Sequence, residues 1–120
     1  MAYLEDTVLG VPTGHFAAAL DIQRRYGGVC VLKGFGTVIV DDAGISVCTY
    51  GNPGMGSGGM GDVLTGVIAG LLAQFDDLSV AAKLGVCVHG RAGDIAAADG
   101  QRGLLASDLM NPIRKLVNPR

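Results

Sequence analysis

A glycine-rich loop that ends in an aspartate holds the residues of this sequence best suited to chemistry. The run is Gly54-Met-Gly-Ser-Gly-Gly-Met-Gly-Asp62, and an apolar segment with helical composition follows it. A helix N-terminus has unpaired N–H groups and a partial positive charge, so it attracts anions. Glycines ahead of it let a phosphate or an oxyanion approach the backbone closely. The sequence therefore predicts an anion site here.

Asp62 stands at the mouth of this predicted anion site. A carboxylate repels the anion that such a site binds, so anion binding alone does not explain it. It is suited to act as a general base that takes a proton from a hydroxyl beside a reacting phosphoryl group. The structural alternative makes Asp62 an ordinary N-cap of the helix that follows. The spacing of the residues leaves both roles open.

Two other nucleotide-binding motifs fit the loop less well. Gly54–Gly59 has the glycine spacing of a dinucleotide fingerprint, and Asp76 follows at about 20 residues. That fingerprint needs a strand before the acid, whereas the run before Asp76 has the composition of a helix. A Walker A loop is excluded because no Gly-Lys-Ser/Thr follows the glycines.

The elements that must position this loop are predicted from periodicity and turn residues. The expected strands are Val29–Lys33, Thr37–Val40 and Ile45–Cys48, with a hairpin turn at Asp41–Gly44. The expected helices are Gly14–Tyr26, Val63–Gln74, Val80–Ala98 and a last segment that begins at Ser107 as N-cap and is interrupted by Pro112. This order predicts an α/β fold.

Burial is also predicted. The continuous apolar run Val29–Lys33 indicates a strand buried on both faces. The helix Val63–Gln74 is apolar on nearly every side and should be buried all round, with Gly66 and Gly70 packed closely against a sheet. Met55 and Met60 are expected to flank the loop as apolar filler.

Four polar side chains outside the loop also receive a predicted role. His89 is expected to be a satisfied structural histidine, and Arg91 and Asp94 are spaced to form an ion pair. Lys33 ends a strand beside glycines, so it either contacts a phosphate or lies in solvent.

Composition excludes several classes of protein. The chain has 120 residues, 49% of them hydrophobic and 17% charged, with 20 glycines and a net charge of −2. Because no basic cluster exceeds two neighbours, nucleic acid is not an expected partner. No uncharged helical stretch is long enough to span a bilayer, and the first residues do not resemble a secretory signal.

Cys30, Cys48 and Cys87 are predicted to be small core thiols of a cytoplasmic protein. His15 lacks a ligand partner, so no protein metal site is expected.

Several segments of the sequence resemble those of a known protein family. The segment Asn52–Gln74 closely resembles the signature of the ADP/ATP-dependent NAD(P)H-hydrate dehydratases of the ribokinase-like superfamily. The runs Tyr26–Thr37, His89–Asp94 and Gly103–Leu109 support the resemblance, which covers about residues 26–109. It implies a ribokinase-like three-layer α/β/α sandwich, of which this chain is expected to be the C-terminal part.

The resemblance implies an activity and a set of site residues. Family members use ADP or ATP, with Mg²⁺, to phosphorylate the hydroxyl of hydrated NADH or NADPH (NADHX or NADPHX), and loss of phosphate restores the ring. Asp62 would bind the substrate and deprotonate its hydroxyl. The residues implied to hold the nucleotide are Lys33, Gly34, Phe35, Gly36, Thr37, Gly58, Gly59, Met60 and Gly61.

One departure from the family pattern affects the expected activity. Family members carry further sandwich ahead of this segment, including a Thr-Pro-His-Pro-Gly-Glu-like stretch that has no match here. Residues 1–120 are therefore expected to form one incomplete domain. An exposed sheet edge would favour a homo-oligomer. Two alternatives stay open: a ribokinase-like kinase that phosphorylates an alcohol, and an inactive fragment that serves only in assembly.

Overall fold

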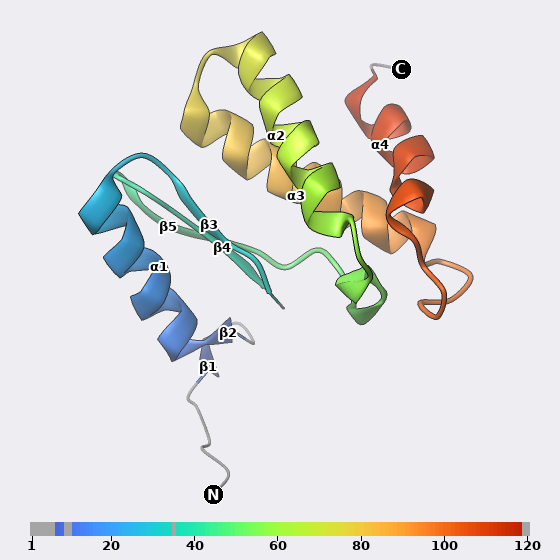
Figure 1. The fold of residues 1–120 in the computed structure, drawn as a ribbon, viewed down its shortest axis with the longest axis horizontal. Coiled ribbons are helices and arrows are strands. Elements are labelled where there is room, and N and C mark those ends of the chain that lie inside the picture. Colours follow the sequence, from blue (N-terminus) through green and yellow to red (C-terminus); the bar gives the residue numbers. More distant parts are fainter. Residues whose placement is uncertain (1–6, 9–10, 35, 119–120) are drawn as a thin grey trace, which may run out of the picture. The chain divides into compact units, whose positions relative to one another are not determined.

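The computed structural model describes residues 7–8, 11–34 and 36–118 (Figure 1). The chain divides into two compact units, Met1–Thr49 and Tyr50–Arg120, and each is described by itself. Within the described residues, no helix combines the length and the apolar character needed to cross a bilayer.

The first unit is built on a three-stranded antiparallel sheet. Two short strands, β1 (Thr7–Val8) and β2 (Val11–Pro12), pair with each other and lead into helix α1 (Thr13–Tyr26). The sheet contains β3 (Cys30–Leu32), β4 (Thr37–Asp41) and β5 (Gly44–Cys48) in the order β3-β4-β5. Helix α1 packs on β3 and β4. The predicted helix and all three predicted strands are therefore present.

The middle strand, β4, carries the core of this unit. Val38 and Val40 are buried with Val11 and Ala19, and Ile39 on the opposite face of the strand is buried as well. The run expected to be a strand buried on both faces, Val29–Lys33, contains β3, which pairs antiparallel with β4 and is only half-buried. The predicted burial was wrong, because the packing of α1 leaves all three residues of β3 only half-buried within the described part of the chain.

The hairpin turn between β4 and β5 forms as its residue types predict. The Asp41 carboxylate accepts hydrogen bonds from the backbone N–H groups of Ala43 at 2.9 Å and Gly44 at 3.0 Å. Gln23 of α1 donates to Asp42 at 2.8 Å and to the carbonyl of Gly28 at 3.2 Å. Side-chain hydrogen bonds thus stabilise the turn and tie it to the end of the helix.

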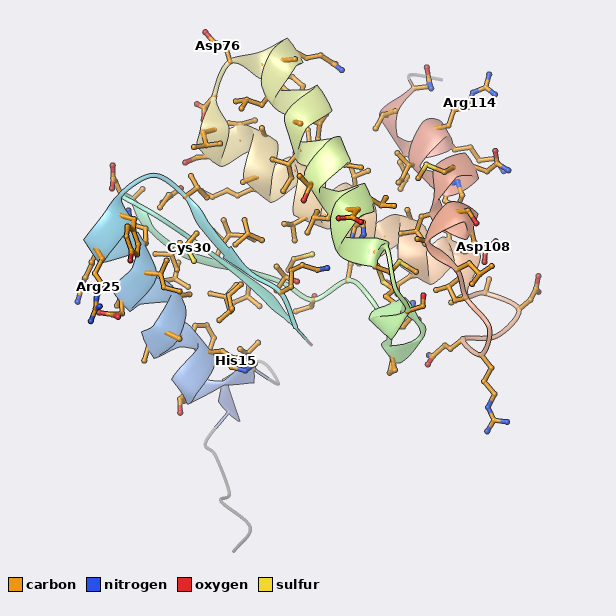
Figure 2. All side chains as sticks on the ribbon, in the orientation of Figure 1. His15, Arg25, Cys30, Asp76, Asp108 and Arg114 are labelled. Atoms are coloured by element: carbon orange, nitrogen blue, oxygen red, sulfur yellow. The ribbon has the colours of Figure 1, made fainter. Side chains whose placement is uncertain are left out.

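The second unit is entirely helical. Its elements are the short 3-10 helix η1 (Pro53–Gly56), α2 (Met60–Phe75), α3 (Leu78–Ala96), a second 3-10 helix η2 (Ala106–Leu109) and α4 (Met110–Val117). Helix α3 packs against both α2 and α4 (Figure 1). Asp76, labelled in Figure 2, lies in the tight connection between α2 and α3, and Asp77 caps α3 by accepting from the N–H of Val80 at 3.1 Å.

Two expectations for the second unit need correction. Helix α2 is not buried all round, since only Met60, Leu64 and Leu71 are fully buried. A Cβ at Gly66 or Gly70 would meet nothing within 4 Å, so neither glycine makes the expected close contact. The close approach is made by α3, where Gly85 lies against Ile68.

The last helical segment also begins differently from the prediction. Ser107 is not the N-cap, because η2 begins after Leu105, whose N–H donates to the Asp108 carboxylate at 2.8 Å. Pro112 is buried in the first turn of α4, where the missing N–H needs no partner. The chain therefore continues from η2 into α4 without a break.

All three cysteines lie in the described part of the chain, and no disulfide joins them. Cys48 is buried, whereas Cys30, labelled on β3 in Figure 2, and Cys87 are half-buried.

The contact between Gly85 and Ile68 predicts opposite effects for two glycine-to-alanine changes. In Gly85→Ala the new Cβ would lie 2.7 Å from a side-chain carbon of Ile68, and overpacking of this kind costs about 1–3 kcal/mol. In the matched control Gly70→Ala the methyl enters open space, and the better helix propensity adds about 0.5–1 kcal/mol. Urea unfolding of both variants measures the difference. Equal free energies of unfolding would contradict the close packing of α3 on α2.

Candidate functional site

The glycine loop, residues 51–59, leads directly into helix α2. Gly59 is the N-cap, with φ 89° and ψ −11°, and no side chain caps the helix. A left-handed conformation at this position favours glycine. The first intrahelical donor is the N–H of Val63, which bonds to the Gly59 carbonyl at 3.1 Å. The N–H groups of Met60, Gly61 and Asp62 therefore have no intrahelical partner, as an anion site requires.

Asp62 occupies the third position of α2, inside the first turn. The alternative N-cap role is wrong, because Gly59 in its left-handed conformation is the N-cap instead. The Asp62 side chain is exposed, and no hydrogen bond or ion pair to the described residues involves it. An acidic residue in a first turn stabilises a helix through its dipole, but an unbonded carboxylate is also free to accept a proton.

The glycines around the start of α2 are accessible to solvent, whereas the methionine among them is buried. Gly58 and Gly59 are exposed and Gly61 is half-buried, whereas Met60 is only 2% exposed. The Met60 side chain belongs to a core cluster with Ala92, Leu104 and Leu109, against which Met55 also packs. The expected role of both methionines as apolar filler is confirmed. Met60 can offer a ligand only its backbone, and its side chain anchors that backbone.

Asp94 of α3 holds the first part of the glycine loop. One carboxylate oxygen accepts from the Gly51 N–H at 3.0 Å, and the other accepts from the Asn52 side-chain amide at 3.0 Å. The amide oxygen of Asn52 accepts in turn from the Gly54 N–H at 3.1 Å and caps η1. The predicted ion pair between Arg91 and Asp94 does not form, because Asp94 bonds to the loop and the Arg91 guanidinium lies 5.6 Å from the centre of the Tyr50 ring.

Small residues on α3 let the loop approach it closely. A Cβ at Gly90 would lie 2.9 Å from the carbonyl oxygen of Tyr50, and a Cβ at Gly93 would overlap the Met55 side chain. Further along the loop, the Ser57 hydroxyl donates to the Leu104 carbonyl at 2.8 Å. Packing and hydrogen bonds thus hold the loop at several points, although glycine is its commonest residue type.

His89 contacts the first residue of α2, just beyond the loop. Its Nε2 lies 3.0 Å from the Met60 carbonyl oxygen, and the ring is 5% exposed. Since a carbonyl only accepts, Nε2 must carry the proton and donate it. This buried, bonded position agrees with the structural role predicted for His89.

The second predicted set of nucleotide-binding residues, Lys33–Thr37, lies in the first unit, on the connection between β3 and β4. Lys33 and Gly34 are exposed, and Gly34 lies close to the His15 ring. Gly36 has φ 76° and backs onto Val11, where a Cβ would overlap the valine side chain. Thr37 begins β4, and Phe35 lies outside the described residues. The structure thus groups Gly58–Asp62 in one unit and Lys33–Thr37 in the other.

Sequence reasoning missed the residues that hold the glycine loop. Asn52, Ser57 and Asp94 all make hydrogen bonds that fix it. A signal existed for Asn52, since asparagine just before Pro53 is typical of a capped turn. Nothing in the spacing of Asp94, more than 40 residues downstream, points to Gly51.

Among the described residues, no group of three or more His, Cys, Asp or Glu side chains could hold a metal ion. The described side chains therefore do not form a metal cage of their own.

Comparison with known proteins gives a consistent picture. The family model described as NAD(P)H-hydrate dehydratase (Carb_kinase) matches residues 2–115. The chain is 58% identical over 109 residues to the bifunctional NAD(P)H-hydrate repair enzyme Nnr of Vibrio cholerae, which is 90% of this chain and 22% of the relative. It is 52% identical over 111 residues to the enzyme of the same name from Coxiella burnetii, 91% of this chain and 23% of the relative. The chain thus spans under a quarter of the length of these curated relatives.

Solved structures match as well. The ADP/ATP-dependent NAD(P)H-hydrate dehydratase of Bacillus subtilis, co-crystallised with ATP and Mg²⁺, is 30% identical, with a TM-score of 0.78 over 90% of this chain and 42% of that one. A ribokinase-like superfamily protein of Enterococcus faecalis is 34% identical, with a TM-score of 0.71 over 86% of this chain and 37% of that one. The predicted ribokinase-like α/β fold is confirmed, and the chain covers part of it.

The His89 contact predicts a loss of stability when the ring is replaced by a side chain without a donor. His89→Leu leaves buried polar groups without their partner, which costs about 1–3 kcal/mol in the free energy of unfolding. His89→Gln keeps an N–H donor and should lose less. Urea unfolding of both variants makes the comparison, and a leucine variant as stable as the original chain would contradict the structural role.

Proposed function

The chain belongs to the NAD(P)H-hydrate dehydratase family, and from this membership we propose that it supplies the phosphate-holding loop and the base of an ADP- or ATP-dependent dehydratase. The proposed reaction returns hydrated NADH and NADPH (NADHX and NADPHX) to NADH and NADPH. The observation that carries the proposal is the start of α2, where N–H groups without an intrahelical partner accompany the exposed, unbonded Asp62 carboxylate.

In this proposal the backbone of Gly58–Gly61 holds the phosphates of the nucleotide. Gly58 and Gly59 carry no side chain and are exposed, so a phosphate oxygen can reach the N–H groups at the helix start. The partial positive charge of the helix end opposes the negative charge that develops on the transferring phosphoryl group. Because the loop is already fixed by hydrogen bonds, little reorganisation accompanies binding.

Asp62 is the proposed base. Its carboxylate takes the proton from the hydroxyl of the hydrate while that oxygen forms a bond to phosphorus, and the bond from phosphorus to the leaving nucleotide oxygen breaks. The phosphorylated carbon then loses phosphate with the electron pair of its C–O bond. Loss of a proton from the neighbouring ring carbon restores the double bond of the dihydropyridine.

The Lys33–Thr37 connection is the proposed second contact with the adenine nucleotide. Lys33 and Gly34 are exposed, so the lysine ammonium is available to a phosphate and the backbone of Gly34 is accessible. The family model matches residues 2–115 and so includes residues of both units, which supports the proposal that residues 1–120 belong to one domain.

Mg²⁺ is the proposed metal of the nucleotide. Since the described side chains form no metal cage, we expect the ion to be held chiefly by the phosphates and water, as Mg²⁺ commonly is. It would neutralise charge on the phosphates. No step proposed for the residues of this chain depends on its position.

The remaining expectations stand as proposals. We infer a cytoplasmic location from the three cysteines that form no disulfide. We infer a homo-oligomer from the half-buried edge strand β3, since an unpaired edge favours association.

The first test of this function is Asp62→Asn, with Asp76→Asn as the control. Asp76 is an exposed aspartate at the opposite end of α2, in a left-handed conformation that asparagine tolerates. Turnover is measured in a chimera in which this chain replaces the aligned 109 residues of the Vibrio cholerae relative. Removal of a general base should lower turnover by about 100-fold or more, while ADP affinity holds or improves because a negative charge is lost.

Three results of this test would count against the proposal. Equal turnover of Asp62→Asn and the parent chimera would remove Asp62 as the base. Absence of ADP binding by the parent chimera would remove the nucleotide site. A stable phosphorylated product from a simple alcohol, with no NADH recovered from its hydrate, would favour a kinase.

The second test places a methyl group where the phosphates are proposed to approach. Gly58→Ala meets nothing within 4 Å in the chain, and neither does the control Gly56→Ala in the same loop. Both variants should keep their melting temperature, because neither glycine has a positive φ. Gly58→Ala alone should weaken ADP binding by about tenfold, measured by isothermal titration calorimetry. Equal weakening by both substitutions would contradict a specific approach at Gly58.

A further inference from the structure

We propose that Asp94 and Asn52 form a positioning pair, which sets the glycine loop in the conformation that receives the phosphates. This proposal depends on the proposed function only for the identity of the ligand. The pair itself is defined by the hydrogen bonds among Asp94, Gly51, Asn52 and Gly54.

The place of Asp94 in its helix is unfavourable in itself. Helix α3 ends at Ala96, so Asp94 lies in the last turn, and no basic residue accompanies it there. The partial negative charge of a helix C-terminus disfavours a carboxylate. The stabilisation that offsets this effect comes from the loop, whose N–H groups donate to Asp94.

The hydrogen bonds leave the two side chains little choice of orientation. Both carboxylate oxygens of Asp94 are used, one by the Gly51 N–H and one by the Asn52 amide nitrogen, each at 3.0 Å. The amide oxygen of Asn52 is then aimed at the Gly54 N–H, 3.1 Å away. Flipping the Asn52 amide would break both of its contacts at once.

A series of fixed residues connects this pair to the exposed glycines at the end of the loop. Asn52 caps η1, which is followed by Ser57, whose hydroxyl is bonded to the Leu104 carbonyl. Gly58 and Gly59 come next and begin α2. Each loop residue that is already ordered in the free protein lowers the conformational-entropy cost of ligand binding. The pair should therefore set nucleotide affinity although it lies outside the phosphate contacts.

A direct catalytic role for Asp94 does not fit this geometry. Both of its oxygens already accept hydrogen bonds from the loop, and the side chain is half-buried. Asp62, by contrast, is exposed and has no bonded partner in the described part of the chain. The two aspartates thus have separate tasks.

The sharpest test exchanges the two side chains. In Asp94→Asn, two amides face each other, and any choice of flips leaves one donor of Gly51, Asn52 or Gly54 without an acceptor. In Asn52→Asp, two carboxylates face each other and repel.

The double variant N52D/D94N restores every hydrogen bond of the pair. Its amide at position 94 accepts from the Gly51 N–H and donates to the carboxylate at position 52, which still accepts from the Gly54 N–H. Asp99→Asn, at an exposed position beyond the end of α3, controls for loss of charge.

Two measurements are made on each variant of the full chain: ADP affinity by isothermal titration calorimetry, and hydrogen exchange of the Gly51 and Gly54 amides by NMR. Each single variant should weaken ADP binding by about tenfold and speed exchange at one or both of these amides by about the same factor. The double variant should return both values to within about threefold of the parent chain. Asp99→Asn should change neither.

The outcomes separate this proposal from the proposed function. Single variants that keep parent-like exchange, or a double variant no better than the singles, would overturn the positioning pair. If the parent chain binds no ADP, nucleotide binding by this chain fails, and the exchange rates alone decide whether the pair holds the loop. If Asp94→Asn does not fold, recovery of folding in the double variant supports the pair, and its absence overturns it.

Discussion

The Asp94 carboxylate holds the glycine-rich loop in one conformation by accepting two hydrogen bonds from it. The glycine loop has few side chains of its own with which to pack, so its conformation depends on groups elsewhere in the chain. Asp94 supplies both oxygens to the start of the loop, and Ser57 reaches the Leu104 carbonyl further along it. Charge-assisted hydrogen bonds of this kind are stronger than neutral ones. The exposed glycines at the start of α2 depend on this support.

The same helix provides the space that the loop needs. Residues 89–94 of α3 place a buried imidazole, two glycines and the carboxylate along successive turns. Gly90 admits the Tyr50 backbone, Gly93 admits the Met55 side chain, and His89 donates to the Met60 carbonyl. The segment resembles the family signature, and each of these contacts gives a physical reason for a residue type in it. Glycine serves here as space for a neighbour, whereas at Gly59 it serves for a left-handed backbone.

The composition now has a more specific explanation. Some of the glycines lie in the loop or at sites of close approach, and the apolar residues are only partly covered within this chain. Tyr50, Phe75, Leu78 and Ile95 are among the large apolar side chains left exposed. Helix α2, which its sequence predicts to be buried all round, keeps much of its surface uncovered. The matched structures contain more than twice the length of this chain, and this is consistent with further covering elements in those proteins.

The sequence alone determined the local structure and the chemistry of the loop. Turn residues, helix caps and apolar periodicity predicted every strand of the main sheet and the principal helices, because those signals act between near neighbours in the chain. The glycine loop and Asp62 were found in the same way. The sequence did not reveal that β3 is a half-buried antiparallel strand or that Gly59 caps α2. It also did not reveal that Asp94 bonds to Gly51 and Asn52. Those features were decided by the tertiary structure, because they depend on which residues distant in the chain meet, and no local pattern contains that information.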